Sequence, residues 1–249
     1  MNGKENKVAF ITGANRGIGF ETARELGEKG ITVILGARDK AKGEEAVAKL
    51  KAQGITATTF QFDINKLSDH QAISKYIEEN YGKLDILINN AGVWLDSTSA
   101  GEKNQTSKTS LDVLRRTFDS NFFNLVVLTQ TLLPLIKKSP AGRIVNLSSI
   151  LGSLTLQSDP TSPIYESKAF AYDASKTALN AFTIHLAHEL KDTNIKVNSA
   201  HPGWVKTDMG GPSAPIEVSE GGKTSVQLAL VPDNSPSGGF YHLGKTLPW

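Results

Sequence analysis

The feature that most limits how this chain can fold is a regular alternation of short apolar runs with helical segments. The runs "KVAFITG" (7–13) and "ITVILGAR" (31–38) are apolar at nearly every position, and residues at helical spacing lie between them. The alternation continues through "ATTFQFD" (57–63), "LDILINNAG" (84–92), "GRIVNLSS" (142–149) and "IKVNSAHPG" (195–203). Strands that are apolar throughout are buried on both faces, so the pattern predicts a parallel sheet with helices on each side.

We therefore expect an α/β protein with a right-handed, doubly wound parallel sheet of about seven strands, ending in an edge strand at "GFYHLG". No linker-like segment divides the chain, so one domain is expected over residues 1–249. A polar loop from about Asp96 to Lys108 precedes a long helix over about Leu111 to Lys137. A stretch rich in Gly and Pro at about 204–222 is predicted to form a substrate flap.

Composition excludes several classes of function. The formal net charge is +2 and the charges alternate in sign, which argues against nucleic acid as a partner. The chain has no cysteine, so thiolate chemistry and disulfides are excluded, and we expect no metal site. The first residues lack the apolar region of a signal peptide, and no apolar run reaches bilayer length. The prediction is a cytoplasmic protein without a membrane partner.

The first predicted strand ends in a glycine-rich turn, "TGANRGIG". Gly13, Gly17 and Gly19 lie between a strand and a helix, where glycines let the backbone approach a pyrophosphate beside the helix N-terminus. Ligands of such sheets collect at the carboxyl ends of the strands. The turn therefore favours a dinucleotide, although an ordinary connection between a strand and a helix has the same pattern.

The second predicted strand ends in "GARD", which bears on the choice of cofactor. An NAD site places a carboxylate here, whereas a 2′-phosphate needs a cation. Ala37 stands where the acid is expected, and Arg38 follows it, with Arg16 in the glycine turn. Two guanidinium groups can hold one phosphate, so NADPH is favoured. The alternatives are that Asp39 is the ribose acid, or that both arginines are only solvated.

Tyr172 and Lys176 stand four residues apart in "YDASK", near the start of a predicted helix. On a helix these side chains lie on one face, one turn apart, so a phenol and an ammonium can reach the same small volume. The spacing also occurs on solvated helix faces that have no role. The pair alone therefore raises the question of catalysis without answering it.

Taken together, these residues resemble the short-chain dehydrogenase/reductase family. The resemblance rests on Gly13-x-x-x-Gly17-x-Gly19, "NNAG" at 89–92, Asn121, Ser149 and Tyr172-x-x-x-Lys176 in the family's order, and it covers about Lys7 to Pro202. Within the family, "HPGWVKTDMGGP", "LLPLIK" and "GRIVNLSS" are similar to the NADPH-dependent carbonyl reductases. The resemblance implies a Rossmann-type fold and NADPH-dependent reduction of a ketone or aldehyde to an alcohol.

The resemblance also implies roles for single residues. Tyr172 is expected to donate the proton, with Lys176 and the oxidised nicotinamide lowering the pKa of its phenol. Ser149 is expected to orient the carbonyl, and its neighbour Ser148 is the less favoured candidate for this role. Asn121 is expected to hold a water against Lys176. An alternative is that Asn121 stabilises a bend in its own helix. The residues expected to contact NADP(H) are Gly13, Asn15, Arg16, Gly17, Ile18, Gly19, Arg38, Asp63 (at the adenine), Ile64, Asn90 (through its backbone), Gly92, Tyr172, Lys176, Pro202, Gly203, Val205 and Thr207 (the last two at the nicotinamide carboxamide).

The segment between Ser149 and Tyr172 is longer than is usual in the family. It is expected to form a loop beside the active site that narrows the pocket and favours a monomer, or else to be a tolerated surface insertion. Two other functions stay open at this point. One is an NAD-dependent alcohol dehydrogenase, and the other is a regulator that binds NADPH without catalysis, for which the Ser149, Tyr172 and Lys176 set would be unnecessary.

Overall fold

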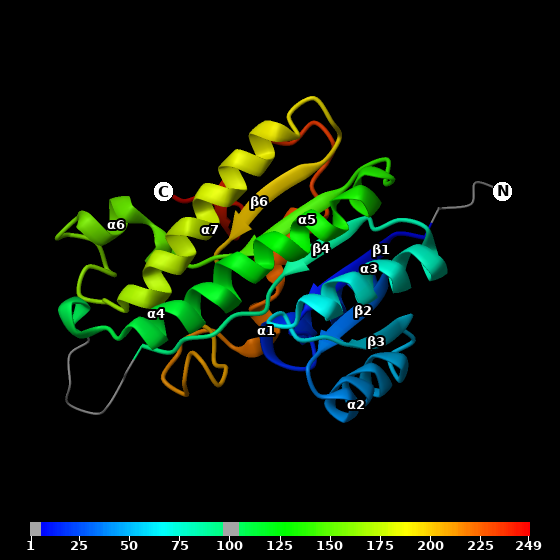
Figure 1. The fold of residues 1–249 in the computed structure, drawn as a ribbon, viewed down its shortest axis with the longest axis horizontal. Coiled ribbons are helices and arrows are strands. Elements are labelled where there is room, and N and C mark those ends of the chain that lie inside the picture. Colours follow the sequence, from blue (N-terminus) through cyan, green and yellow to red (C-terminus); the bar gives the residue numbers. More distant parts are fainter. Residues whose placement is uncertain (1–5, 97–104) are drawn as a thin grey trace.

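The computed structural model describes residues 6–96 and 105–249, and its centre is a sheet of eight strands (Figure 1). The strand order is β3-β2-β1-β4-β5-β6-β7-β8, so the winding of the chain reverses between β1 and β4. All neighbouring pairs from β3 to β7 are parallel, and β8 pairs antiparallel with β7. The strands are β1 (Val8–Thr12), β2 (Thr32–Ala37), β3 (Ala57–Gln61), β4 (Ile86–Asn89), β5 (Arg143–Leu147), β6 (Lys196–Ala200), β7 (Phe240–His242) and β8 (Lys245–Thr246).

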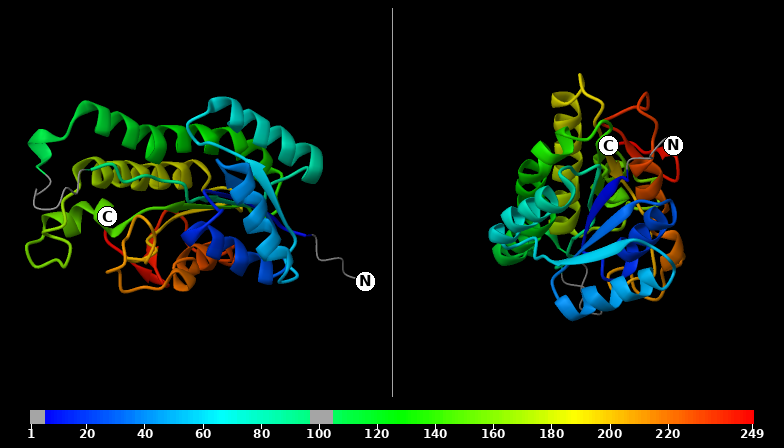
Figure 2. Two further views of the ribbon diagram at one scale, coloured as in Figure 1. Left: turned by 90° about the horizontal axis from the view of Figure 1, so that it is seen from below. Right: turned by 90° about the vertical axis from the view of Figure 1, so that its right-hand side faces the viewer.

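Helices cover both faces of the sheet, as Figure 2 shows. On one face lie α1 (Gly17–Glu28), α2 (Lys40–Lys51) and α8 (Lys223–Ala229). On the other lie α3 (Leu67–Tyr81), α4 (Leu111–Phe118), α5 (Asn124–Lys137) and α7 (Phe170–Glu189). Shorter elements are the five-residue α6 (Leu154–Ser158), the 3-10 turns η1 (Thr106–Lys108), η3 (Ile150–Gly152) and η4 (Val218–Glu220), and the π-helical turn η2 (Asp119–Phe123).

Each face of the sheet has its own apolar core. Leu26 of α1 and Leu50 of α2 pack in one cluster, while Ile77 of α3, Leu132 of α5 and Leu186 of α7 pack in the other. Because both faces are covered, every residue of β1, β2, β4 and β5 is buried, which explains why the central strands are largely apolar without alternation. The predicted doubly wound α/β fold is confirmed, as is the parallel arrangement of the first seven strands.

The structure departs from the sequence prediction in three places. The segment between Ser149 and Tyr172, predicted to be a loop, contains η3 and α6. The short antiparallel strand β8 was not predicted. The helix predicted over about 111–137 is interrupted by the wide turn η2, which separates α4 from α5. Of the predicted polar loop, residues 97–104 lie outside the described residues, whereas Asp96 is buried. Among the helices of the described residues, none has both the length and the apolar character that crossing a bilayer requires.

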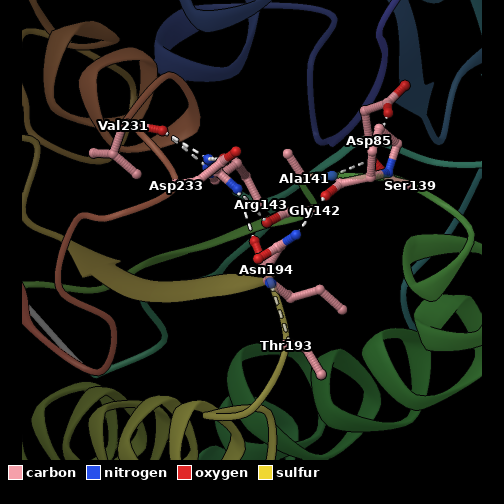
Figure 3. Close-up of polar contacts among 11 residues, drawn as sticks. Asp85, Ser139, Ala141, Gly142, Arg143, Thr193, Asn194, Val231 and Asp233 are labelled. Carbon is pink, nitrogen blue, oxygen red and sulfur yellow. Dashed lines mark hydrogen bonds and ion pairs between the residues drawn. The ribbon is translucent and has the colours of Figure 1, made fainter.

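Buried ionic groups stabilise the amino ends of the strands (Figure 3). Arg143, the first residue of β5, is 2% exposed and donates to three backbone carbonyls, among them that of Val231, and to Asp233 at 2.5 Å. Nearby, Asp85 accepts a hydrogen bond from the hydroxyl of Ser139 at 2.5 Å. Burial of paired polar groups at this edge agrees with a structural role. The opposite edge, at the carboxyl ends, is where a ligand site is expected.

Candidate active site

A cavity of about 460 Å³ opens at the carboxyl ends of β1 to β4, where the strand order reverses. Its walls come from the turn between β1 and α1, from the residues that follow β2, β3 and β4, and from residues 206–209 of the predicted flap. This is the place where doubly wound sheets bind ligands. The position of the cavity therefore follows directly from the topology.

The glycine turn brings backbone close to the cavity. Gly13 and Gly17 have φ of +65° and +58°, which side-chain-bearing residues rarely adopt. At Gly19 a Cβ would lie 2.6 Å from both Nδ2 of Asn90 and the carbonyl oxygen of Gly13, so any larger residue would displace the turn. Arg16 occupies the N-cap of α1, but its side chain accepts no hydrogen bond from the helix. The first N–H groups of α1 can therefore donate to an anionic ligand.

Cationic side chains line the cavity beside the glycine turn. Arg16, Arg38, Lys42 and Lys206 all contribute to its wall. Arg16 forms an exposed ion pair with Asp208 of the flap, which also lines the cavity. Such an arrangement fits a doubly charged phosphate group.

The carboxylate that the sequence offered as an alternative has a structural role. Asp39 accepts a hydrogen bond from the backbone N–H of Lys42 at 3.1 Å and so caps α2, although it also lines the cavity. Ala37, where an NAD site would place an acid, is buried at the end of β2. The end of this strand therefore presents Arg38 to the cavity, next to an Asp39 carboxylate that caps α2.

The structure brings together the four residues that the sequence proposed as catalytic. Tyr172 and Lys176 lie one turn apart on α7, and the Nζ of Lys176 is 5.6 Å from the centre of the Tyr172 ring. The hydroxyl of Ser149, two residues after β5, lies close enough to the Tyr172 phenol to act on its pKa. Lys176 donates to the carbonyl oxygen of Leu147 at 2.7 Å, and Leu147 lines the cavity. The phenol, hydroxyl and ammonium thus share one buried region behind the cavity wall.

Burial shifts the pKa values of both α7 groups. It raises the pKa of Tyr172 to about 12, against the lowering effect of the Ser149 hydrogen bond, and Asp173 raises it further. Burial lowers the pKa of Lys176 to about 8. The expected lowering of the phenol pKa is therefore not produced by the protein's own groups. At neutral pH Tyr172 is a neutral phenol that carries its proton, and Lys176 is a cation.

Asn121 lies in the wide turn η2 and faces Lys176 across Gly92. Its Oδ1 accepts from the backbone N–H of Val93 at 2.8 Å, and its Nδ2 donates to Val93 O at 2.9 Å and to Ser175 Oγ at 3.0 Å. A Cβ on Gly92 would lie 3.3 Å from Asn121 Oδ1 and 3.6 Å from Lys176 Nζ. The missing side chain of Gly92 therefore leaves room between the two groups, and π turns often occur at functional sites.

The structure distinguishes between Ser148 and Ser149, the two candidates for the orienting hydroxyl. Ser148 is buried and donates to Oδ1 of Asn180 on α7 at 2.7 Å, so its proton is already used. The Oγ of Ser149 accepts a hydrogen bond from the N–H of Leu151, and the same hydroxyl acts on the pKa of the Tyr172 phenol. Of the pair, Ser149 has the position that an orienting hydroxyl needs.

The half-buried His201, which follows β6, supports the loop that carries Ser149. Nδ1 of His201 accepts from the N–H of Ile150 at 3.2 Å, directly after Ser149. Burial, together with His242, lowers the pKa of His201 to about 3, so the ring is neutral and can accept. A single histidine in a loop gives no periodic signal, which is why the sequence did not reveal this contact.

Most of the predicted cofactor residues line the cavity. They are Gly13, Asn15, Arg16, Gly17, Ile18, Gly19, Arg38, Asp63, Ile64, Asn90, Gly92 and Thr207. The predicted contact through the backbone of Asn90 is supplemented by its side chain, which donates to Thr12 O and Gly13 O and holds the glycine turn. Lining residues that the sequence did not single out include Lys42, Phe62, Ser120, Lys206 and Asp208.

Five predicted contacts do not line the cavity, namely Tyr172, Lys176, Pro202, Gly203 and Val205. The first two lie behind Gly92 and Leu147. Gly203 is covered by the flap, since a Cβ there would meet Ile216 Cδ1 at 2.3 Å. Val205 is buried and bridges to Ile216. Ile216 of the predicted flap therefore packs against Gly203 and against Val205, which lies in the same predicted segment.

Comparison with known proteins gives a consistent result. The family model for short chain dehydrogenase matches residues 7–216. Carbonyl reductase [NADPH] 1 of Mus musculus is 32% identical over 280 aligned positions, which cover 97% of this chain and 98% of that protein. (-)-Isopiperitenone reductase of Mentha piperita is 33% identical over 309 positions, with 97% and 98% covered. Both alignments exceed the 249 residues of this chain, so each relative has residues that the chain lacks.

Solved structures agree with the curated relatives. Salutaridine reductase from Papaver somniferum superposes with a TM-score of 0.82 at 30% identity, covering 95% of this chain and 99% of that one. An NADPH-bound carbonyl reductase from chicken fatty liver has a TM-score of 0.83 at 26% identity, covering 98% and 100%. The similarity in both sequence and structure extends over nearly the whole length of each chain.

Proposed function

The chain belongs to the short-chain dehydrogenase family, and from this premise we propose that it uses NADPH to reduce a ketone or an aldehyde to an alcohol. The observation that carries the proposal is the buried phenol of Tyr172, which keeps its proton at neutral pH beside the Ser149 hydroxyl and Lys176. A carbonyl that accepts a hydride develops negative charge on oxygen and needs an acid at that atom. A protonated phenol supports reduction.

The lining of the cavity fits NADPH. The glycine turn admits a pyrophosphate, and Arg38, Lys42 and Arg16 provide positive charge where the 2′-phosphate would lie. The mouse relative is named a carbonyl reductase [NADPH], and the chicken carbonyl reductase structure has NADPH bound, which agrees with this cationic wall. When bound, NADPH supplies the hydride that adds to the carbonyl carbon.

The chain's own residues then have distinct tasks. The hydroxyl of Ser149 donates a hydrogen bond to the carbonyl oxygen, and Tyr172 Oη transfers its proton to the same atom, which completes the alcohol. The ammonium of Lys176 stabilises the resulting phenolate. A water held in the space beside Gly92, between Asn121 and Lys176, would return a proton from solvent. We further propose that residues 204–222 close over the substrate as a flap.

The test is a spectrophotometric screen of NADPH oxidation over aromatic ketones, ketoesters, quinones and aldehydes, with the Tyr172→Phe variant beside the wild type. We expect the variant to lose at least about a hundredfold in kcat, because the general acid is removed, while NADPH binding is retained. Tyr81→Phe is the matched control, since burial also raises the pKa of Tyr81 to about 12 but that phenol lies at the end of α3, away from the cavity. Turnover in Tyr172→Phe equal to that of the control would remove Tyr172 from the mechanism.

A further inference from the structure

The helix that carries Tyr172 is capped by a residue far away in the sequence. Ala169 occupies the N-cap of α7 and has no side chain that could accept a hydrogen bond. The N–H groups of Ala171 and Tyr172 instead donate to Oδ1 and Oδ2 of Asp96, at 3.0 and 2.9 Å. N–H groups in a first helical turn have no partner within the helix, and a side-chain oxygen commonly satisfies them. Asp96 is 8% exposed, so this cap is buried.

The same short segment also holds the ring of Tyr172. The indole of Trp94 stacks on the Tyr172 ring, with 4.6 Å between the centroids and 28° between the planes. Val93, one residue earlier, exchanges two backbone hydrogen bonds with the side chain of Asn121. The stretch 93–96 after β4 therefore contacts the proton donor at both its main chain and its ring, as well as Asn121.

We infer that Asp96 is a positioning residue that acts through Tyr172, an inference that rests on the proposed function of Tyr172 as proton donor. The carboxylate fixes the first turn of α7 and so the direction in which the phenol leaves the helix. A helix whose first turn is free to fray would let the phenol move away from the carbonyl oxygen. Misplacement of an acid by about 1 Å can cost as much as a hundredfold in rate.

The experiment compares Asp96→Ala and Asp96→Asn with the wild type in the NADPH-oxidation assay. The Asn variant keeps the size of the side chain and one acceptor oxygen but loses the negative charge. If the Ala variant does not fold, the Asn variant is the one compared with the wild type. The matched control is Ser139→Ala, which removes another buried hydrogen bond to a carboxylate, that of Asp85, at the amino end of the sheet (Figure 3). Each protein is measured for kcat, for KM of the carbonyl and of NADPH, and for thermal unfolding.

We expect Asp96→Ala to lower kcat by about tenfold, with KM for NADPH unchanged. Asp96→Asn should keep more of the activity, and KM for the carbonyl should change little in either variant, because the cap acts on the position of the phenol. Ser139→Ala should lose thermal stability without a loss of kcat. If both Asp96 variants keep the wild-type kcat and lose only stability, the positioning role is wrong. Absence of turnover in the wild type would instead contradict the proposed function itself.

Discussion

Arg38 is the side chain whose removal best distinguishes NADPH from NADH. It follows β2, is exposed to solvent and lines the cavity beside the glycine turn. NADH lacks the 2′-phosphate, so a leucine at this position should weaken NADPH binding and leave NADH binding unchanged. Lys40→Leu removes the same charge two residues later, where the side chain pairs with Glu44 outside the cavity wall, and is the matched control.

The expected magnitude follows from the exposure of the group. A hydrogen bond between charged partners contributes about 1.5 to 3 kcal/mol, and an exposed guanidinium belongs at the lower end of that range. A loss of about 1.5 kcal/mol corresponds to roughly a tenfold weaker Kd for NADPH. Lys42 lines the same wall, and its ammonium adds about 1 kcal/mol, or roughly fivefold, in the double variant with Arg38→Leu.

Fluorescence titration measures both cofactors directly, since the chain contains three tryptophans whose emission overlaps the absorption of reduced nicotinamide. Titrations of the wild type, Arg38→Leu, Lys40→Leu and the double variant at one ionic strength give the two Kd values for each protein. The reasoning is refuted if Arg38→Leu weakens NADH as much as NADPH, or if Lys40→Leu has the same effect on NADPH as Arg38→Leu.

Four further changes have defined outcomes. Asp208→Asn should release Arg16 for the phosphate and tighten NADPH by up to about fivefold, and an unchanged Kd would contradict this. Gly92→Ala should fill the space between Asn121 and Lys176 and lower kcat by roughly tenfold; unchanged kcat would rule out a relay there. Burial raises the pKa of Asp173 to about 7, so the folded protein binds a proton that the unfolded chain releases near pH 4, and stability falls as the pH rises through this window. Asp173→Asn should therefore raise the melting temperature relative to wild type at pH 8 but not at pH 4, as measured by calorimetry. Arg143→Met should lower the free energy of unfolding by about 3 kcal/mol, because buried carbonyls lose their donor, while denaturant-corrected kcat stays as in the wild type.

The elements that the sequence predicted are those whose signals are local. Apolar runs gave the strands β1 to β6 because burial on both faces needs no knowledge of distant residues. The glycine turn, Arg38 and the pair Tyr172 and Lys176 were found from spacing within a single element. The structure places the glycine turn and Arg38 at one cavity, with Tyr172 and Lys176 behind its wall, because parallel strands end at the same edge of the sheet.

What the sequence did not reveal depends on contacts between distant segments. Asp96 caps a helix that begins more than seventy residues later, and no local pattern marks such a partner. The neutral state of His201 and the raised pKa of Tyr172 result from burial, which depends on how the elements pack. The strand β8 has only two residues, too few for any periodic signal.

The wide turn η2 between α4 and α5 has an evolutionary consequence. It lets α4 pack against α7 while α5 packs on α3, because one extra residue rotates the two helices by about 100° against each other. Loss of a single codon from 119–123 would restore an uninterrupted helical repeat and turn the amide of Asn121 away from Lys176. A descendant with that deletion would inherit the sheet and the cavity but lose the proposed proton relay, which is a short mutational route from the proposed reductase to a protein that only binds its cofactor.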